Sequence, residues 1–341
     1  MNTTSKRMPE FEVVRGIAIL LLLVHHSGFY GLDLWGFSPK GLSPYFEAFL
    51  LGTFFFLSGY FTETSLQRSG GNLAGFFISR NIKVFPPYLV ALALYISVLG
   101  ITLRERYDLL VYATGVQFIF AGAVKPIVTL WYVGAILVYY VIFALLWKVT
   151  PNMIGFISVA AILFILALLL YYATGLLDVR FFKYYFVFLT GMLFARLDES
   201  SGILSSRYLL AKGALAILGV SAFSLALTAN PVSPSYIFAS YIFIVSATLL
   251  LFALIASLHI AAPWRWVTAI SYASYFAYLF HRPFWKLIED QIPLQGLQNQ
   301  ILFRMLPASV VVLVACYFLQ QSYDYLVGLF KRQSQRPSLT F

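Results

Sequence analysis

Long apolar segments recur along the whole of this 341-residue chain, and they restrict its possible folds more than any other feature. A helix needs about 20 apolar residues to cross the hydrocarbon core of a bilayer. A helix also satisfies its backbone hydrogen bonds internally, which apolar surroundings require. We therefore predict a bundle of ten transmembrane helices, at residues 11–29, 46–65, 84–102, 127–147, 153–173, 182–197, 208–228, 236–258, 267–285 and 302–330.

The composition excludes a soluble protein. Hydrophobic residues make up 61% of the chain and charged residues only 11%, whereas about a quarter of a typical soluble domain is charged. We find no polar block large enough for a separate soluble domain, so we expect residues 1–341 to form one all-α membrane domain in contact with the lipid bilayer. The net charge of +10 does not indicate nucleic-acid binding, because the basic residues are scattered between apolar segments.

An even number of spans places both termini on one side of the membrane. The positive-inside rule favours the cytoplasm, since thirteen Lys and Arg residues, among them Lys6, Arg7 and Arg336, then lie inside and nine outside. The sequence thus predicts a multi-pass protein of the plasma (inner) membrane with cytoplasmic termini. The apolar stretch 109–122 is too short to cross and is expected to lie at the interface or to re-enter.

The first apolar segment carries Arg15, His25 and His26, and ionisable residues such as these are costly inside a membrane and usually mark a site. Arg15 and His25 lie about 15 Å apart along a helix axis and about 80° apart around it, so both can line one cavity. His26, about 100° further round, is expected to face elsewhere. The alternative is anchoring, with Arg15 extended to the headgroups and His25 at the opposite interface.

A basic segment precedes the third predicted span. Arg80 and Lys83 are three residues apart, so on a helix they share one face, and Pro86 and Pro87 follow them at the start of the span. In the predicted topology these cations and Arg15 form a cationic mouth on the cytoplasmic side. Such a mouth suits phosphate groups, although ordinary positive-inside anchoring is the alternative.

Several motifs resemble, in order along the chain, signatures of the acyltransferase-3 family of integral membrane O-acyltransferases. They are R-G-I-A-I-L-L-L-L-V-H from Arg15, F-F-F-L-S-G-Y at 54–60, the basic pair before Pro86, L-W-Y-V at 130–133 and S-Y-A-S-Y-F-A-Y-L-F-H-R-P at 271–283. Two positions depart from the family pattern: Lys83 stands where a second arginine is more usual, and the glutamate that often follows the tryptophan is absent after Trp131.

The resemblance implies an enzyme that moves an acyl group, usually acetyl, from acyl-CoA in the cytoplasm to a hydroxyl of a cell-surface or lipid-linked glycan. Acetyl-CoA is then the acyl donor, and no metal is expected. Arg15, Arg80 and Lys83 would bind the phosphates of coenzyme A. Trp131, Tyr132 and His281 are candidates for contact with the acceptor, with His281 at the start of an outward-facing H-R-P turn.

The transfer needs a base for the proton of the acceptor hydroxyl, and imidazole suits this role. We predict that His25 is this residue, either as a base or as a nucleophile that carries the acyl group. Asp33, Glu47 and Glu63 are candidates for the acid that orients it.

A second class of function fits the same composition. A transporter or flippase for a lipid-linked glycan or a small anionic solute would also place charged and aromatic residues inside a helix bundle. The sequence shows no internal repeat, which disfavours a transporter. Dependence on acetyl-CoA would distinguish the two classes.

Overall fold

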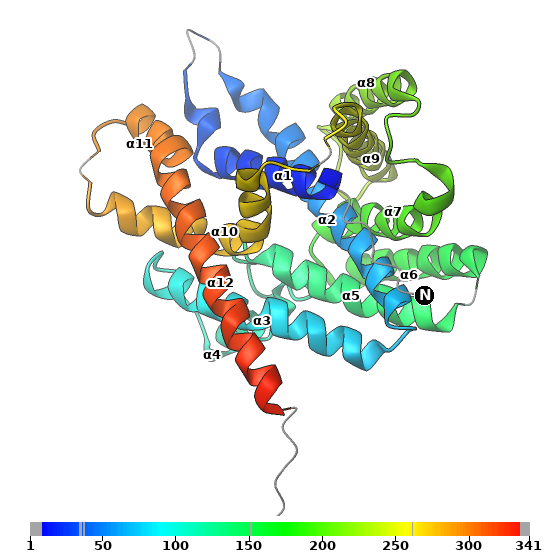
Figure 1. Cartoon of the computed structure of the whole chain (residues 1–341), viewed down its shortest axis with the longest axis horizontal. Coiled ribbons are helices and arrows are strands. Elements are labelled where there is room, and N and C mark those ends of the chain that lie inside the picture. Colours follow the sequence, from blue (N-terminus) through cyan, green and yellow to red (C-terminus); the bar gives the residue numbers. More distant parts are fainter. Residues whose placement is uncertain are drawn as a thin grey trace, which may run out of the picture.

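The computed structural model describes residues 9–334 except 34, 35, 37, 151, 261 and 293, and every regular element among them is a helix (Figure 1). This confirms the all-α prediction, while Lys6, Arg7 and Arg336 lie outside the described residues. The long helices are α1 (Pro9–His26), α2 (Ser43–Arg68), α3 (Leu73–Ser97), α5 (Trp131–Val149), α6 (Met153–Thr174), α7 (Arg180–Ser201), α8 (Leu209–Ala226), α9 (Pro234–Ser257), α10 (Arg265–Glu289) and α12 (Ser309–Ser334). The short ones are η1 (Phe29–Gly31), η2 (Pro39–Leu42), α4 (Arg106–Ala113), η3 (Val116–Phe118), α11 (Leu297–Phe303) and the π-helix η4 (Arg304–Ala308).

Five described helical segments are long and apolar enough to cross a bilayer: α5, α6, α8, α9 and the α11–η4–α12 segment up to Phe330. Large apolar side chains cover their outer faces, for example Ile154 (80% exposed), Leu210 (89%) and Leu225 (86%). Water would make such a surface costly, whereas lipid would not. These helices identify a multi-pass integral membrane protein. The other five predicted spans fall on α1, α2, α3, α7 and α10, and at 109–122 α4 is too short to cross.

Helix α1 occupies the centre of the bundle. It packs against α10 on one side and against α2 and α9 on the other (Figure 1). Phe11, Val14, Ile19 and Leu22 are buried in these contacts. The helix ends at His26, three residues before the predicted boundary, because Gly28 adopts a left-handed conformation (φ 92°) and leads into η1.

Two glycines allow α2 and α7 to cross in backbone contact. A Cβ atom added to Gly59 would lie 2.1 Å from the carbonyl oxygen of Phe188, and one added to Gly191 would lie 2.1 Å from the carbonyl oxygen of Phe56. Small residues at a crossing let two membrane helices approach closely and gain van der Waals contact. This crossing anchors α2, which carries residues of both cavities described below.

Helix α3 begins at Leu73 and continues through two prolines, Pro86 and Pro87, so the prediction that the third span starts at residue 84 is wrong. Proline has no N–H, and Pro86 therefore leaves the carbonyl of Ile82 without its usual helical donor. The hydroxyl of Tyr323 on α12 donates to that carbonyl instead. This substitute donor from a distant part of the chain lets the helix extend back to Leu73.

The H-R-P sequence at 281–283 does not form the predicted turn either. Helix α10 runs through it, with Pro283 buried inside the helix. Packing of α10 against α1 and α12 covers this region, and such tertiary contacts commonly outweigh local helix preference.

We expect Gly59→Ala and Gly191→Ala each to destabilise the fold by about 1–3 kcal/mol, because the added methyl group collides with a backbone carbonyl. Gly213→Ala on α8 is the matched control, since nothing lies within 4 Å of its added Cβ. Unfolding in detergent can be followed by the reactivity of Cys316, the single cysteine of the chain and a buried one. If all three variants unfolded at the same temperature, the close contact between α2 and α7 would contribute nothing to the stability of the fold.

Candidate functional site

A cavity of about 400 Å³ lies between α1, α2, α3, α5, α10 and α12, and we call it the first cavity. Arg15, Arg80 and Lys83 all line it, so the structure brings together the three cations that the sequence grouped. Its other walls are mainly aromatic and hydroxyl-bearing side chains, including Phe61, Ser58, Tyr132, Tyr140, Tyr275 and Tyr278.

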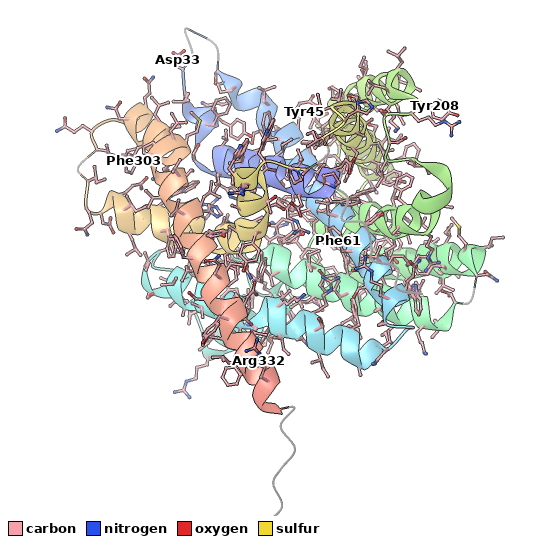
Figure 2. The ribbon with its side chains drawn as sticks, viewed as in Figure 1. Asp33, Tyr45, Phe61, Tyr208, Phe303 and Arg332 are labelled. Carbon is pink, nitrogen blue, oxygen red and sulfur yellow. The ribbon has the colours of Figure 1, made fainter. Side chains whose placement is uncertain are left out.

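The three cations of the first cavity are not balanced by ion pairs. The guanidinium of Arg15 lies over the ring of Phe61 at 5.2 Å, and Nη2 of Arg80 donates to the carbonyl of Phe61 at 3.0 Å (Phe61 is labelled in Figure 2). Lys83 is exposed. In the part of the chain that the structure describes, no carboxylate oxygen lies within 4.0 Å of any of them. The arrangement attracts a polyanion, and phosphate groups match guanidinium donors best.

The carboxylate on this wall belongs to Asp324 of α12. It accepts hydrogen bonds from the hydroxyl of Tyr272 at 2.5 Å and from the amide of Gln320 at 3.1 Å. These neutral donors satisfy the carboxylate without taking up any of the three cations.

A second cavity, of about 220 Å³, lies at the other end of α1. It is lined from α1 by His25 and His26, from α2 by Glu47, from α5 by Trp131, from α7 by Arg180 and from α10 by Arg282 and Tyr278. Arg15 and His25 therefore line different cavities and not the single one that the helical geometry allowed. The prediction that His26 faces elsewhere is wrong, because at the last turn of α1 both histidines reach the same space.

His26 is paired with His281. Nδ1 of His26 lies 2.9 Å from Nε2 of His281, and Nδ1 of His281 lies 2.9 Å from the carbonyl oxygens of both Ala277 and Tyr278. A carbonyl oxygen can only accept, so Nδ1 carries the proton of the neutral His281 ring and Nε2 accepts from Nδ1–H of His26. The remaining nitrogen of His26, Nε2, is then unprotonated on a residue of the cavity wall.

His25 has a different partner. Its Nδ1 lies 2.7 Å from the hydroxyl of Tyr30 in η1, and either group can donate in this pair. The tautomer of His25 is therefore not fixed by its contact, in contrast to that of His26. His281 is wholly buried behind His26, so the predicted contact of His281 with the acceptor finds no support in this geometry.

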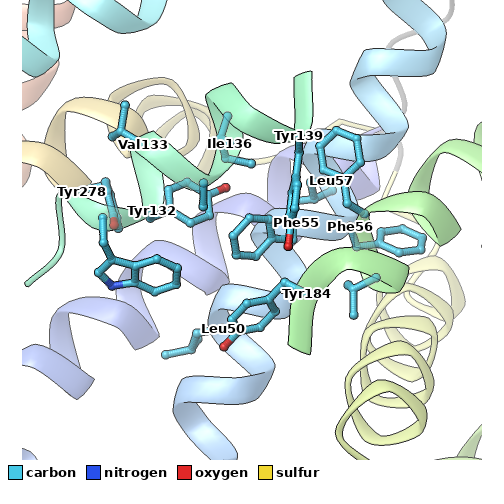
Figure 3. Close-up of a cluster of buried hydrophobic side chains, with 14 of the residues drawn as sticks. Leu50, Phe55, Phe56, Leu57, Tyr132, Val133, Ile136, Tyr139, Tyr184 and Tyr278 are labelled. Carbon is cyan, nitrogen blue, oxygen red and sulfur yellow. The ribbon is translucent and has the colours of Figure 1, made fainter. Parts of the chain in front are cut away.

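Trp131 and Tyr132 are consecutive residues of α5 that serve different cavities. Trp131 lines the second cavity, and the guanidinium of Arg180 lies 3.8 Å from the centre of its ring. Tyr132 lines the first cavity, and the centre of its ring lies 4.8 Å from that of Phe55 and 5.2 Å from that of Tyr278. Figure 3 shows these rings in the aromatic layer where α2, α5 and α10 meet.

Among the three acids proposed to orient the base, Glu47 alone lines a cavity beside the histidines. The carboxylate of Glu63 lies 2.8 Å from Arg196 and accepts from Trp147 and Gln67, in a separate buried network. Asp33 accepts from the backbone of Gly36 in an exposed loop.

Sequence reasoning missed the roles of Arg180 and Arg282 on the second cavity and treated both as outer-loop charges. Arg180 and Arg282 lie far from His25 and His26 in the sequence. Only the packing of α7 against α2 and of α10 against α1 brings them to the same cavity. Among the described residues, no three His, Cys, Asp or Glu side chains gather closely enough to hold a metal ion.

Comparison with known proteins supports one family. A family model described as an acyltransferase domain (Acyl_transf_3) matches residues 8–320. This match includes every residue that lines the second cavity and, apart from Tyr323 and Asp324, every residue that lines the first; of the long helices, only α12 extends beyond it. No curated protein and no solved structure matches the chain.

Proposed function

The chain belongs to the acyltransferase-3 family, and from that premise we propose that it transfers an acyl group, most simply acetyl, from cytoplasmic acyl-CoA to a hydroxyl of a cell-surface or lipid-linked glycan. The observation that carries the proposal is the pair of cavities at opposite ends of α1. One gathers three cations that form no ion pair with any carboxylate of the described residues, and the other holds a histidine with an available lone pair.

Arg15, Arg80 and Lys83 would bind the phosphates of the donor in the first cavity. The guanidinium of Arg80 already donates one N–H to the carbonyl of Phe61, and this bond fixes its position. Its other N–H groups remain to bind a phosphate. The ammonium of Lys83 supplies a point charge, whereas a second arginine would supply a planar guanidinium with several donors. The aromatic walls of this cavity suit the uncharged arm of coenzyme A, which leads toward the thioester.

The transfer itself needs one proton to move. The acceptor oxygen forms a bond to the thioester carbonyl carbon, the carbon–sulfur bond breaks, and the hydroxyl proton passes to the base and then to the departing thiolate. Nε2 of His26 can take this proton, because the contact with His281 holds the proton of the ring on Nδ1. His281 would act as a positioning residue that also stabilises the protonated ring.

The sequence alone favoured His25 for this role, and that prediction stays open to test. The structure gives the stronger argument to His26, since its free nitrogen is defined by a chain of two hydrogen bonds. His25, with Tyr30 as its partner, would instead help to line the acceptor pocket.

The second cavity suits a sugar acceptor. Trp131 borders the cavity with the guanidinium of Arg180 over its ring, and Glu47 and Arg282 offer an acceptor and donors for hydroxyl groups. Asp178 is ion-paired with Arg180, and Glu47 and Arg282 add one charge of each sign to the lining. A neutral, hydroxyl-rich acceptor therefore fits this pocket better than a strongly anionic one.

The transmembrane arrangement is part of the proposal. Ten long helices, of which five meet the hydropathy of a membrane span on their own, support ten crossings with both termini in the cytoplasm of a plasma-membrane protein. The less apolar helices α1, α2, α3, α7 and α10 carry many of the residues of the two cavities, and α5 and α12 add others, among them Trp131, Tyr132 and Asp324. Polar residues of membrane helices face such interiors.

Reporter fusions test the topology. A cytoplasmic reporter joined after Glu199 or after Phe330 should be active, because the sixth and the tenth crossings both end inside. A periplasmic-type reporter at the same positions should be silent. Activity of the periplasmic-type reporter at either position would contradict the ten-span arrangement.

Donor binding tests the role of the first cavity. Arg15→Ala should weaken acetyl-CoA binding by about 10- to 100-fold, since the loss of one charge-assisted hydrogen bond costs about 1.5–3 kcal/mol. Arg68→Ala is the matched control, because Arg68 is also basic but lies outside the first cavity. Unchanged donor affinity in a folded Arg15→Ala protein would remove the cationic cavity from the mechanism.

Transfer of labelled acetyl from acetyl-CoA by the purified protein in proteoliposomes tests the activity and the base together. His26→Ala should lower the rate by a factor of about 10² to 10⁴, the usual contribution of a general base. Donor affinity should remain, because the phosphates would bind in the other cavity. His25→Ala should retain more activity than His26→Ala. The reverse order would restore His25 as the base, and movement of the glycan without acetyl-CoA would favour a flippase.

A further inference from the structure

One tyrosine stands between the two cavities. Tyr278 of α10 lines both the first and the second cavity. The neighbouring residues of α5 divide between them, with Tyr132 facing the first cavity and Trp131 the second. The wall that separates the cationic cavity from the histidine cavity is therefore formed by the first turn of α5 and by Tyr278. Figure 3 shows Tyr132 and Tyr278 next to each other.

The contact that holds Tyr278 in this wall involves an unusual backbone. Its hydroxyl donates to the carbonyl oxygen of Thr129, directly before α5. Thr129 has φ 77°, and a β-branched residue in this left-handed region is a genuine outlier that costs about 1–3 kcal/mol. Such a conformation persists only where its surroundings enforce it.

A second side chain from the same helix also holds Thr129. Nε of Arg282, one turn after Tyr278 on α10, donates to Oγ1 of Thr129 at 2.9 Å. Thr129 is buried, and side chains of α10 donate hydrogen bonds to both its carbonyl and its hydroxyl. Release of either hydrogen bond would allow the strained backbone to relax.

We propose that the Tyr278–Thr129 contact is a gate between the two cavities. This inference rests on the proposed function, which needs the thioester of a donor held in the first cavity to reach His26 in the second. Rotation of the Tyr278 ring breaks one hydrogen bond and opens the wall at the side chain that both cavities share. Relaxation of Thr129 offsets part of the cost of that opening.

The closed gate has a chemical purpose. Water can take the place of the acceptor hydroxyl at the thioester carbonyl, in which case the carbon–sulfur bond breaks and the products are acetate and free coenzyme A. A closed wall keeps the thioester apart from the histidines and from water in the second cavity. Opening that depends on a correctly seated donor and acceptor would restrict this loss.

The test compares Tyr278→Phe with Tyr139→Phe in proteoliposomes. Both substitutions remove a hydroxyl that donates to a backbone carbonyl, but Tyr139 bonds to Phe181 and lines neither cavity. Acetyl-CoA hydrolysis without acceptor and acetyl transfer with acceptor are measured for each protein, and donor affinity is measured as the check on folding.

Tyr278→Phe should raise acceptor-independent hydrolysis by about fivefold, the change in an opening equilibrium when one ordinary hydrogen bond is lost. The number of acetyl groups transferred per coenzyme A released should fall, with donor affinity unchanged. Tyr139→Phe should keep the coupling of the unsubstituted protein. Thr129→Gly relieves the strain of the positive φ and removes the hydrogen bond to Arg282, so it should also raise acceptor-independent hydrolysis. It provides a second variant if Tyr278→Phe does not fold.

The outcomes separate the gate from the function. If the unsubstituted protein transfers acetyl and both variants keep its coupling, the gate is overturned while the proposed function stands. An unsubstituted protein that transfers no acetyl from acetyl-CoA overturns the proposed function and the gate with it. Failure of both Tyr278→Phe and Thr129→Gly to fold would assign the contact to structure alone and would also overturn the gate.

Discussion

Hydrogen bonds from tyrosine hydroxyls to backbone carbonyls connect the elements of this protein. A buried hydroxyl needs a partner, and a helical carbonyl has a second lone pair that can accept it. The bond ties two elements together without burying a charge, which suits a chain that is 61% hydrophobic and contains 23 tyrosines. The donors to another element are Tyr88, Tyr112, Tyr139, Tyr185, Tyr275, Tyr278 and Tyr323. Two of them, Tyr275 and Tyr323, hold α3 around its prolines and so place Arg80 and Lys83 on the first cavity.

A layer of aromatic rings separates the titratable residues of the two cavities. The cations of the first cavity and the histidines of the second lie on opposite sides of a layer of aromatic rings, among them Phe55, Tyr132 and Tyr278. Such a layer of rings places no formal charge between the cavities. On the proposed function, a polyanionic donor would be held on one side and an acceptor on the other, so the wall between them is as necessary as either cavity.

Much of the fold could be predicted because hydropathy reports directly on helices in lipid. Each of the ten predicted spans falls on a long helix, and the grouping of Arg15 with Arg80 and Lys83 in one cavity is confirmed. The third span was predicted to start at residue 84, whereas α3 starts at Leu73, for a physical reason: Pro86 normally interrupts a helix, and the donor that compensates for it, Tyr323, lies far along the chain.

The second cavity could not be predicted to the same degree. A helical wheel separates His25 from His26 by about 100°, yet both reach the cavity at the point where α1 ends. The partner of His26, the residue His281, comes from a helix that the sequence ended in a turn at that point. The positive φ of Thr129 has no signature in its residue type, since threonine rarely adopts it.

One turn of α10 links the wall to the histidine pair. Tyr278, His281 and Arg282 lie within five residues, and Nδ1 of His281 donates to the carbonyl of Tyr278 itself. The hydroxyl of Tyr278 and the guanidinium of Arg282 both hold Thr129, while the ring of His281 fixes the tautomer of His26. A movement of this turn that released Thr129 would therefore also disturb the hydrogen bond that orients His26. On the proposed mechanism, access of the thioester and readiness of the base depend on the same few backbone and side-chain positions, so the reaction can be confined to the state in which both are in place.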